Sequence, residues 1–175
     1  MPFTTPSGRK VVLAGNPVIE EFTVETTTNV KPGRLVKKGT LATDIVAMAA
    51  PTDKPAGFVG WDAEGAHPSV SPATRDTAYA ATKKAPVVYG PGTILVSKLA
   101  SGQNVTKDTP LVPASGSPYE LAAAANIGGT EGSASKHVSA TFTGSFPPGG
   151  MIVALAKENM DASAAAKDII VESLI

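Results

Sequence analysis

Cysteine is absent from this chain of 175 residues. The chain therefore has no disulfide framework, no thiolate nucleophile and no zinc–thiolate site. Charge is also scarce, because charged residues make up 17% and the 15 Lys and Arg balance the 15 Asp and Glu. A chain with zero net charge and no basic block is not typical of proteins that bind nucleic acid through its phosphates. We expect no nucleic-acid partner.

Long apolar runs are missing as well. No run approaches the roughly 18 residues that a membrane-crossing helix needs, and the opening MPFTTPSGRK lacks the apolar core of a signal peptide. We therefore expect neither a membrane partner nor a recognisable export signal. The hydrophobic share of 42% is too high for a disordered chain of such low charge. Its length suits one ordinary domain or two very small ones.

Short apolar segments rich in Val and Ile lie between turns made by 17 Gly and 15 Pro. Residues 20–28 alternate apolar and polar side chains, and residues 168–175 cluster β-branched ones, both typical of strands. Regular spacing of about 8–12 residues between such segments favours a barrel or sandwich. The expected strands are 10–14, 18–27, 35–36, 44–49, 57–61, 86–89, 93–98, 111–112, 138–143, 151–156 and 167–175.

Helix is expected only in short pieces. Ser117 and Glu120 resemble a capping box before the alanine-rich residues 121–125, and residues 161–167 could form one further turn. Two loops are predicted, at 63–84 and 126–136. The predicted fold class is all-β: a single small β-barrel, or a two-lobed β-barrel or sandwich, with long Gly/Pro-rich loops and at most one or two very short helices.

Two stretches of the sequence resemble each other, which suggests an internal repeat. Residues 31–41 resemble residues 100–111, with Lys38-Gly39-Thr40 facing Lys107-Asp108-Thr109. The segment from Ala56 is matched by the one from Gly150, and a Val-rich strand closes each half. We predict an N-terminal arm and first strands over 1–29, followed by a barrel domain over 30–175 with pseudo-repeats at about 30–98 and 99–175.

No catalytic, cofactor-binding or metal-binding constellation stands out. His67 and His137 lie in or beside predicted loops without a nucleophile elbow. The acidic residues are scattered, and the pair Asp62 and Glu64 reads best as a solvated turn. Trp61 is expected to be a core or interface residue. We expect a protein that is not an enzyme and carries no cofactor.

One alternative starts from residues 30–39, VKPGRLVKKG, which resemble the strand and turn of swinging-arm carrier domains. Lys54, in Thr52-Asp53-Lys54, would then be the modified lysine. However, Pro55 follows Lys54, and the lysine lies further from Gly39 than such domains require. A carrier-type or small-ligand-binding β-barrel is therefore kept as the alternative, and an exported carbohydrate-binding or adhesin domain as a third class.

A different resemblance covers most of the chain from Val30 onward. The turn VKPGRLVKKGT (30–40), the strand AGFVG (56–60), the turn SGQNVTKDTPLV (101–112) and the ending at 152–175 are similar to the β-barrel decoration, or head-stabilising, proteins of tailed-virus capsids. The long loops at 63–84 and 126–136 depart from the compact family pattern. The resemblance implies a non-enzymatic protein on the capsid exterior of the virion. The resemblance also implies that the protein binds the major capsid protein and that it forms a homotrimer.

The first residues give the only candidate contacts with the shell. The segment MPFTTPSGRK contains two prolines and one aromatic residue. We hypothesise an extended arm that anchors Phe3 and adds backbone hydrogen bonds to a neighbouring sheet edge, while a frayed terminus is the alternative. The predicted capsid-contacting residues are Pro2, Phe3, Thr4 and Thr5.

Overall fold

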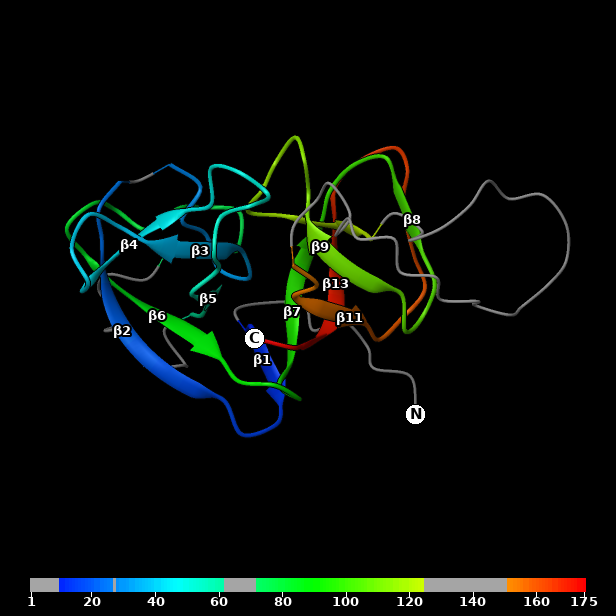
Figure 1. Cartoon of the computed structure of the whole chain (residues 1–175), viewed down its shortest axis with the longest axis horizontal. Coiled ribbons are helices and arrows are strands. Elements are labelled where there is room, and N and C mark those ends of the chain that lie inside the picture. The colour runs from blue at the N-terminus through cyan, green and yellow to red at the C-terminus, as the bar shows by residue number, and fades with distance from the viewer. Residues whose placement is uncertain (1–9, 27, 62–71, 125–150) are drawn as a thin grey trace, which may run out of the picture.

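The computed structural model of the protein describes residues 10–26, 28–61, 72–124 and 151–175. Over these residues the regular structure consists of strands and contains no helix. The prediction of an all-β fold with barrels is confirmed. Figure 1 shows two lobes side by side, one built from β2 to β6 and the other from β7 to β13.

The first lobe is a closed ring of five strands in the order β2-β4-β3-β5-β6. The β2–β4 pair is parallel and the other pairs are antiparallel. Alternate apolar side chains fill the ring, among them Phe22, Val36 and Val87. The strands are β2 (Val18–Val24), β3 (Leu35–Lys38), β4 (Asp44–Ala47), β5 (Gly57–Val59) and β6 (Lys84–Tyr89).

The second lobe is also a ring, because β13 pairs with β7 and closes the sheet β7-β10-β9-β11-β13. Strand β1 (Val12–Ala14) lies on the outer edge of β7, and β8 (Gln103–Val105) pairs with β12 (Met160–Ala162). The ring strands are β7 (Ile94–Leu99), β9 (Pro110–Pro113), β10 (Leu121–Ala123), β11 (Ala154–Ala156) and β13 (Lys167–Ser173).

The two rings have the same topology and the same register. In each, the first and third strands in chain order are parallel and every other neighbour is antiparallel. One residue correspondence satisfies all five pairings of both rings, so the strands are staggered equally and the barrels have the same shear. Each strand pair of the first ring has one counterpart in the second. Given with the first-ring pair first, they are Ile19–Val88 with Ile94–Glu172, Val24–Ile45 with Leu99–Leu121, Val36–Ala47 with Leu111–Ala123, Leu35–Phe58 with Pro110–Leu155, and Val59–Val87 with Ala156–Val171.

The turns between the strands repeat too. The Gly33 N–H donates to the Val59 carbonyl at 2.7 Å, and in the second ring the Asp108 N–H donates to the Ala156 carbonyl at 2.7 Å. Gly33 and Asp108 both have positive φ, 77° and 65°. A shared register and shared turns over two whole rings identify the second ring as an internal repeat of the first.

This correspondence differs from the internal similarity seen in the sequence. The structure aligns Pro32-Gly33-Arg34, rather than Lys38-Gly39-Thr40, with Lys107-Asp108-Thr109. The rings span residues 18–89 and 94–173, whereas the expected halves were about 30–98 and 99–175. Because similar Gly- and Lys-containing turns occur at both ends of β3, sequence similarity alone selects the wrong one.

Ten expected strands are present, but 138–143 lies outside the described residues. Strands β3, β6 and β9 are longer than expected, β7 is shifted by one residue, and the other six are shorter. The expected helix after Ser117 is wrong: the Glu120 N–H closes a turn on the Ser117 carbonyl, and the chain then enters β10. Residues 121–123 lie between β7 and β9, where their backbone pairs in the sheet. Tertiary pairing overrides the helix propensity of alanine there. Strands β8 and β12 were also not expected.

One apolar cluster joins the two rings, beside the separate core inside the first ring. Leu35, Phe58 and Trp61 leave the first ring on its outer face and pack in the same cluster as the interior residues of the second ring, such as Leu95 and Val171. All five are at most 1% exposed. The sequence-based assignment of Trp61 to the core or an interface agrees with this position. Since each lobe buries apolar surface of the other, the two barrels form one packed unit.

Candidate functional site

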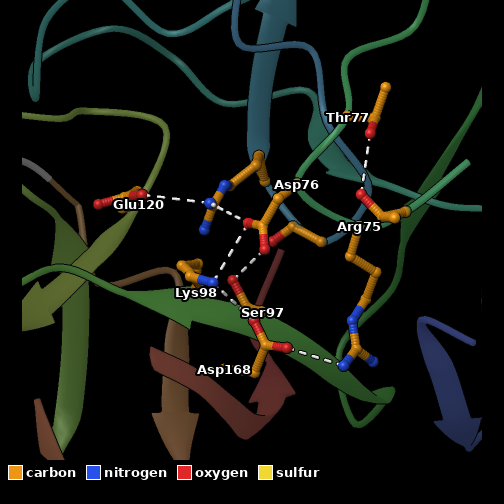
Figure 2. A network of polar contacts seen from close by, with 10 residues as sticks. Arg75, Asp76, Thr77, Ser97, Lys98, Glu120 and Asp168 are labelled. Atoms are coloured by element: carbon orange, nitrogen blue, oxygen red, sulfur yellow. Dashed lines mark hydrogen bonds and ion pairs between the residues drawn. The ribbon is translucent and has the colours of Figure 1, made fainter. Parts of the chain in front are cut away.

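A network of charged side chains lies where the two rings meet (Figure 2). Arg34 is at the start of β3, Lys98 is on β7 and Asp168 is on β13, while Arg75 and Asp76 belong to the segment between β5 and β6. Lys98 and Asp168 are neighbours through the pairing of β7 with β13, whereas the contacts of Asp76 with Lys98 and of Arg75 with Asp168 form because the two barrels are packed against each other.

Arg34 is the buried member of this network. Its side chain is 5% exposed, and its guanidinium lies 3.3 Å from both the Asp76 and the Glu120 carboxylates. Its Nε has no hydrogen-bond partner among the described residues. Taking a guanidinium out of water is costly, and the two carboxylates offset that cost. The arrangement therefore holds β3 against the turn that precedes β10.

The exposed side of the network contains two further cations. Lys98 lies 3.2 Å from Asp76 and 3.2 Å from Asp168, and Arg75 lies 2.7 Å from Asp168. Burial acts to raise the pKa of Asp76, but the hydrogen bond from Lys98 and the charges of Lys98 and Arg34 lower that pKa below its ordinary value. The Asp76 carboxylate thus stays ionised between two cations, as in a structural ion-pair network.

Backbone contacts next to Arg34 reinforce the same junction. The Ser97 hydroxyl donates to the Gly33 carbonyl at 2.7 Å, and the Leu35 N–H donates to the Tyr119 carbonyl at 3.0 Å. Ser97 is 2% exposed. Apart from the Arg34 Nε, these polar groups are paired across the two lobes, so the geometry of the junction is that of a clamp between barrels.

A hollow of about 480 Å³ opens at one end of the first barrel. Four of its lining residues make specific contacts with one another in two pairs. Lys38 places its ammonium 3.4 Å from the centre of the Phe22 ring, and the Tyr89 hydroxyl donates to Glu20 at 2.7 Å. The lining residues are Glu20, Phe22, Lys37, Lys38, Lys54, Pro55, Ala56 and Tyr89.

The charges around this hollow are mostly compensated. Lys37 lies 2.9 Å from Asp53, and its hydrogen bond lowers the pKa of that carboxyl. The hydrogen bond to Glu20 raises the pKa of the Tyr89 phenol. Lys54, the lysine of the carrier alternative, is exposed on the rim and forms no ion pair or hydrogen bond with the described residues. An apolar ring beside a compensated set of charges could accept a small amphipathic molecule.

The predicted arm residues Pro2, Phe3, Thr4 and Thr5 lie outside the described residues, as do His67, His137, Asp62 and Glu64. Over residues 10–26, 28–61, 72–124 and 151–175 there is no group of three or more His, Cys, Asp or Glu side chains that could hold a metal ion. Within the same ranges, no helix is long and apolar enough to cross a membrane. Sequence reasoning missed both the ion network and the hollow, because neither has a motif with fixed spacing.

Comparison with known proteins adds no relative. No protein-family model matches the chain, and no curated protein is significantly similar to it.

Proposed function

We propose that the protein is a structural virion component that binds the outside of an icosahedral capsid and joins neighbouring major capsid subunits. The observation that carries the proposal is the joining of two closed barrels through one apolar cluster and an ion-pair clamp around the buried Arg34. Closed rings leave few free sheet edges, and a shared cluster resists separation of the lobes. A block of this kind suits a protein that transmits load between its neighbours.

The resemblance of residues 30–40, 56–60, 101–112 and 152–175 to decoration proteins supports the same proposal. In this reading the protein is not an enzyme, it acts as a homotrimer on the capsid exterior, and the arm residues Pro2 to Thr5 contact the shell. Low surface charge also suits burial against other subunits in a symmetric assembly.

Binding to empty shells of a candidate major capsid protein tests this function. We expect the full chain to co-sediment with the shells in a saturable way and to raise their melting temperature. A variant that lacks residues 1–9 should bind less, and undiminished occupancy would refute the role of the arm. A chain that ignores every shell offered and stays monomeric at high concentration contradicts the proposal.

The hollow at the mouth of the first barrel favours one second candidate, a small-ligand or carrier-type barrel. Phe22 and Tyr89 give it an apolar wall, and Lys54 stands free on its rim. Mass spectrometry of native material separates the two functions. A covalent group on Lys54, or a small molecule that is retained by the wild type and lost on Tyr89→Ala, would support the carrier or ligand function.

A further inference from the structure

The two rings differ at one edge. Strand β1 covers the outer edge of β7 by antiparallel pairing at Ile94 and Leu95. The corresponding stretch of β2 is Ile19 and Glu20, and among the described residues β6 is its only strand partner. Strand β4 pairs with β2 only at Thr23 and Val24. Within the part of the chain that the structure describes, the first ring therefore has an open edge at the place where the second ring carries a sixth strand.

The backbone of β2 is oriented to accept such a strand. The Thr23 N–H donates to the carbonyl of Thr43, which directly precedes β4. The Val24 N–H donates to the carbonyl of Lys83, which directly precedes β6. Because successive residues of a strand present their N–H and C=O groups to opposite edges, Glu21 faces the same edge as Thr23. Its counterpart Val96 donates its N–H to the Val11 carbonyl at 2.8 Å.

The side chains on the two edges also differ in how far they are exposed to solvent. On the covered edge, Thr93, the counterpart of Val18, is 1% exposed, and Ile94, the counterpart of Ile19, is half-buried. On the open edge, Val18 is 49% and Ile19 is 39% exposed, and both are large apolar residues. Adjacent exposed apolar side chains on an unpaired edge are what natural sheets avoid unless a partner covers them.

We propose that the edge of β2 at residues 18–21 binds an extended segment of another protein, which adds to the first ring as an antiparallel strand in the way that β1 adds to the second. The segment carries apolar residues to cover Val18 and Ile19, and a basic residue to meet the exposed Glu21. The segment that contains β1 has this chemistry, since Val11, Val12 and Leu13 follow Lys10. Main-chain hydrogen bonds supply affinity and the alternate side chains supply specificity.

A second copy of this chain is a poorer occupant. Antiparallel pairing of two β2 edges around a two-fold axis would bring Glu20 and Glu21 of both copies close together, and like charges across a strand pair are destabilising. The β1 strand of a second copy is already paired with its own β7. A partner of basic and apolar character avoids both problems.

A synthetic peptide with the sequence of residues 9–15, RKVVLAG, serves as the probe for the full-length protein. We expect saturable amide chemical-shift changes confined to residues 18–22 and their neighbours on β6. Glu21→Pro removes both the outward N–H and the carboxylate, so it should bind the peptide about tenfold more weakly than Glu21→Thr does, the effect of losing roughly one hydrogen bond. Glu21→Thr, which keeps the N–H and the strand propensity, separates this loss from the loss of charge.

Three results would overturn the inference. The first is no change at residues 18–22 at millimolar peptide. The second is protection of the Glu21 amide from hydrogen exchange that grows with protein concentration, which would assign the edge to a second copy. The third is concentration-independent protection without peptide, which would assign it to the chain's own segments. If Glu21→Pro does not fold by circular dichroism, peptide-induced protection of the wild-type Glu21 amide decides instead.

Discussion

The Ser97 hydroxyl of the second barrel donates a hydrogen bond of 2.7 Å to the carbonyl of Gly33, at the entrance to β3 of the first. This contact brings the backbones of the two rings so close that a Cβ on Gly33 would lie 2.6 Å from the Val96 carbonyl oxygen. The matching residue of the second ring, Asp108, also has positive φ but is not glycine. Backbone conformation alone therefore does not require glycine at position 33; the approach of the second barrel does.

Gly33→Ala should consequently destabilise the protein by about 2–4 kcal/mol, since it combines left-handed strain with overpacking against backbone. Gly102→Ala is the matched control, because Gly102 has a φ of +82° and nothing within 4 Å of the added Cβ. The control should cost only about 1 kcal/mol of strain. Urea unfolding of both variants measures the difference, and equal losses would contradict the close approach.

The buried guanidinium gives a second prediction. Arg34→Met should lower the free energy of unfolding by about 3–5 kcal/mol, because it leaves the Glu120 carboxylate, 13% exposed, without its cation. The double variant Arg34→Met, Glu120→Gln should regain part of that loss, since no unpaired charge is then buried. A double-mutant cycle in urea gives the coupling energy. Additive effects would show that the two side chains do not interact.

The shared apolar cluster predicts one unfolding transition for both barrels. Trp61, the sole tryptophan, reports on the junction, while far-ultraviolet circular dichroism reports on all strands. The two signals should give superimposable urea curves. Phe58→Ala should shift both together and cost about 3–5 kcal/mol, because it opens a cavity between the lobes. Separate midpoints would mean that the barrels unfold independently.

Acid should weaken the turn between β4 and β5. The hydrogen bond from Lys37 lowers the pKa of Asp53 in the folded protein, below the value near 3.9 of an unfolded chain. A carboxyl with a depressed folded pKa stabilises the fold above its unfolded pKa, and this contribution disappears as pH falls through the folded value. Asp53→Asn should therefore be less stable than the wild type at pH 7, and the difference should shrink below about pH 4. Thermal unfolding at several pH values measures it, and a pH-independent difference would assign the effect to the backbone contacts of Asp53 alone.

Much of the fold follows from local sequence. The β-branched run DIIV at 168–171 can bury both faces, and it becomes the longest paired stretch of the second ring. Strand β10 could not be predicted, since Leu121 and two alanines favour a helix until β7 and β9 pair with them. Nor could the clamp: Arg75 and Asp168 are 93 positions apart, and their meeting depends on the packing of two barrels that no local pattern encodes.

The outer face of the first ring has a consequence for the stability of a single ring. A polypeptide of one ring would leave Leu35 and Phe58 in water unless a second polypeptide covered them. A single ring of this kind would need a second ring to be stable in water. Covalent linkage keeps the two rings together at high effective concentration.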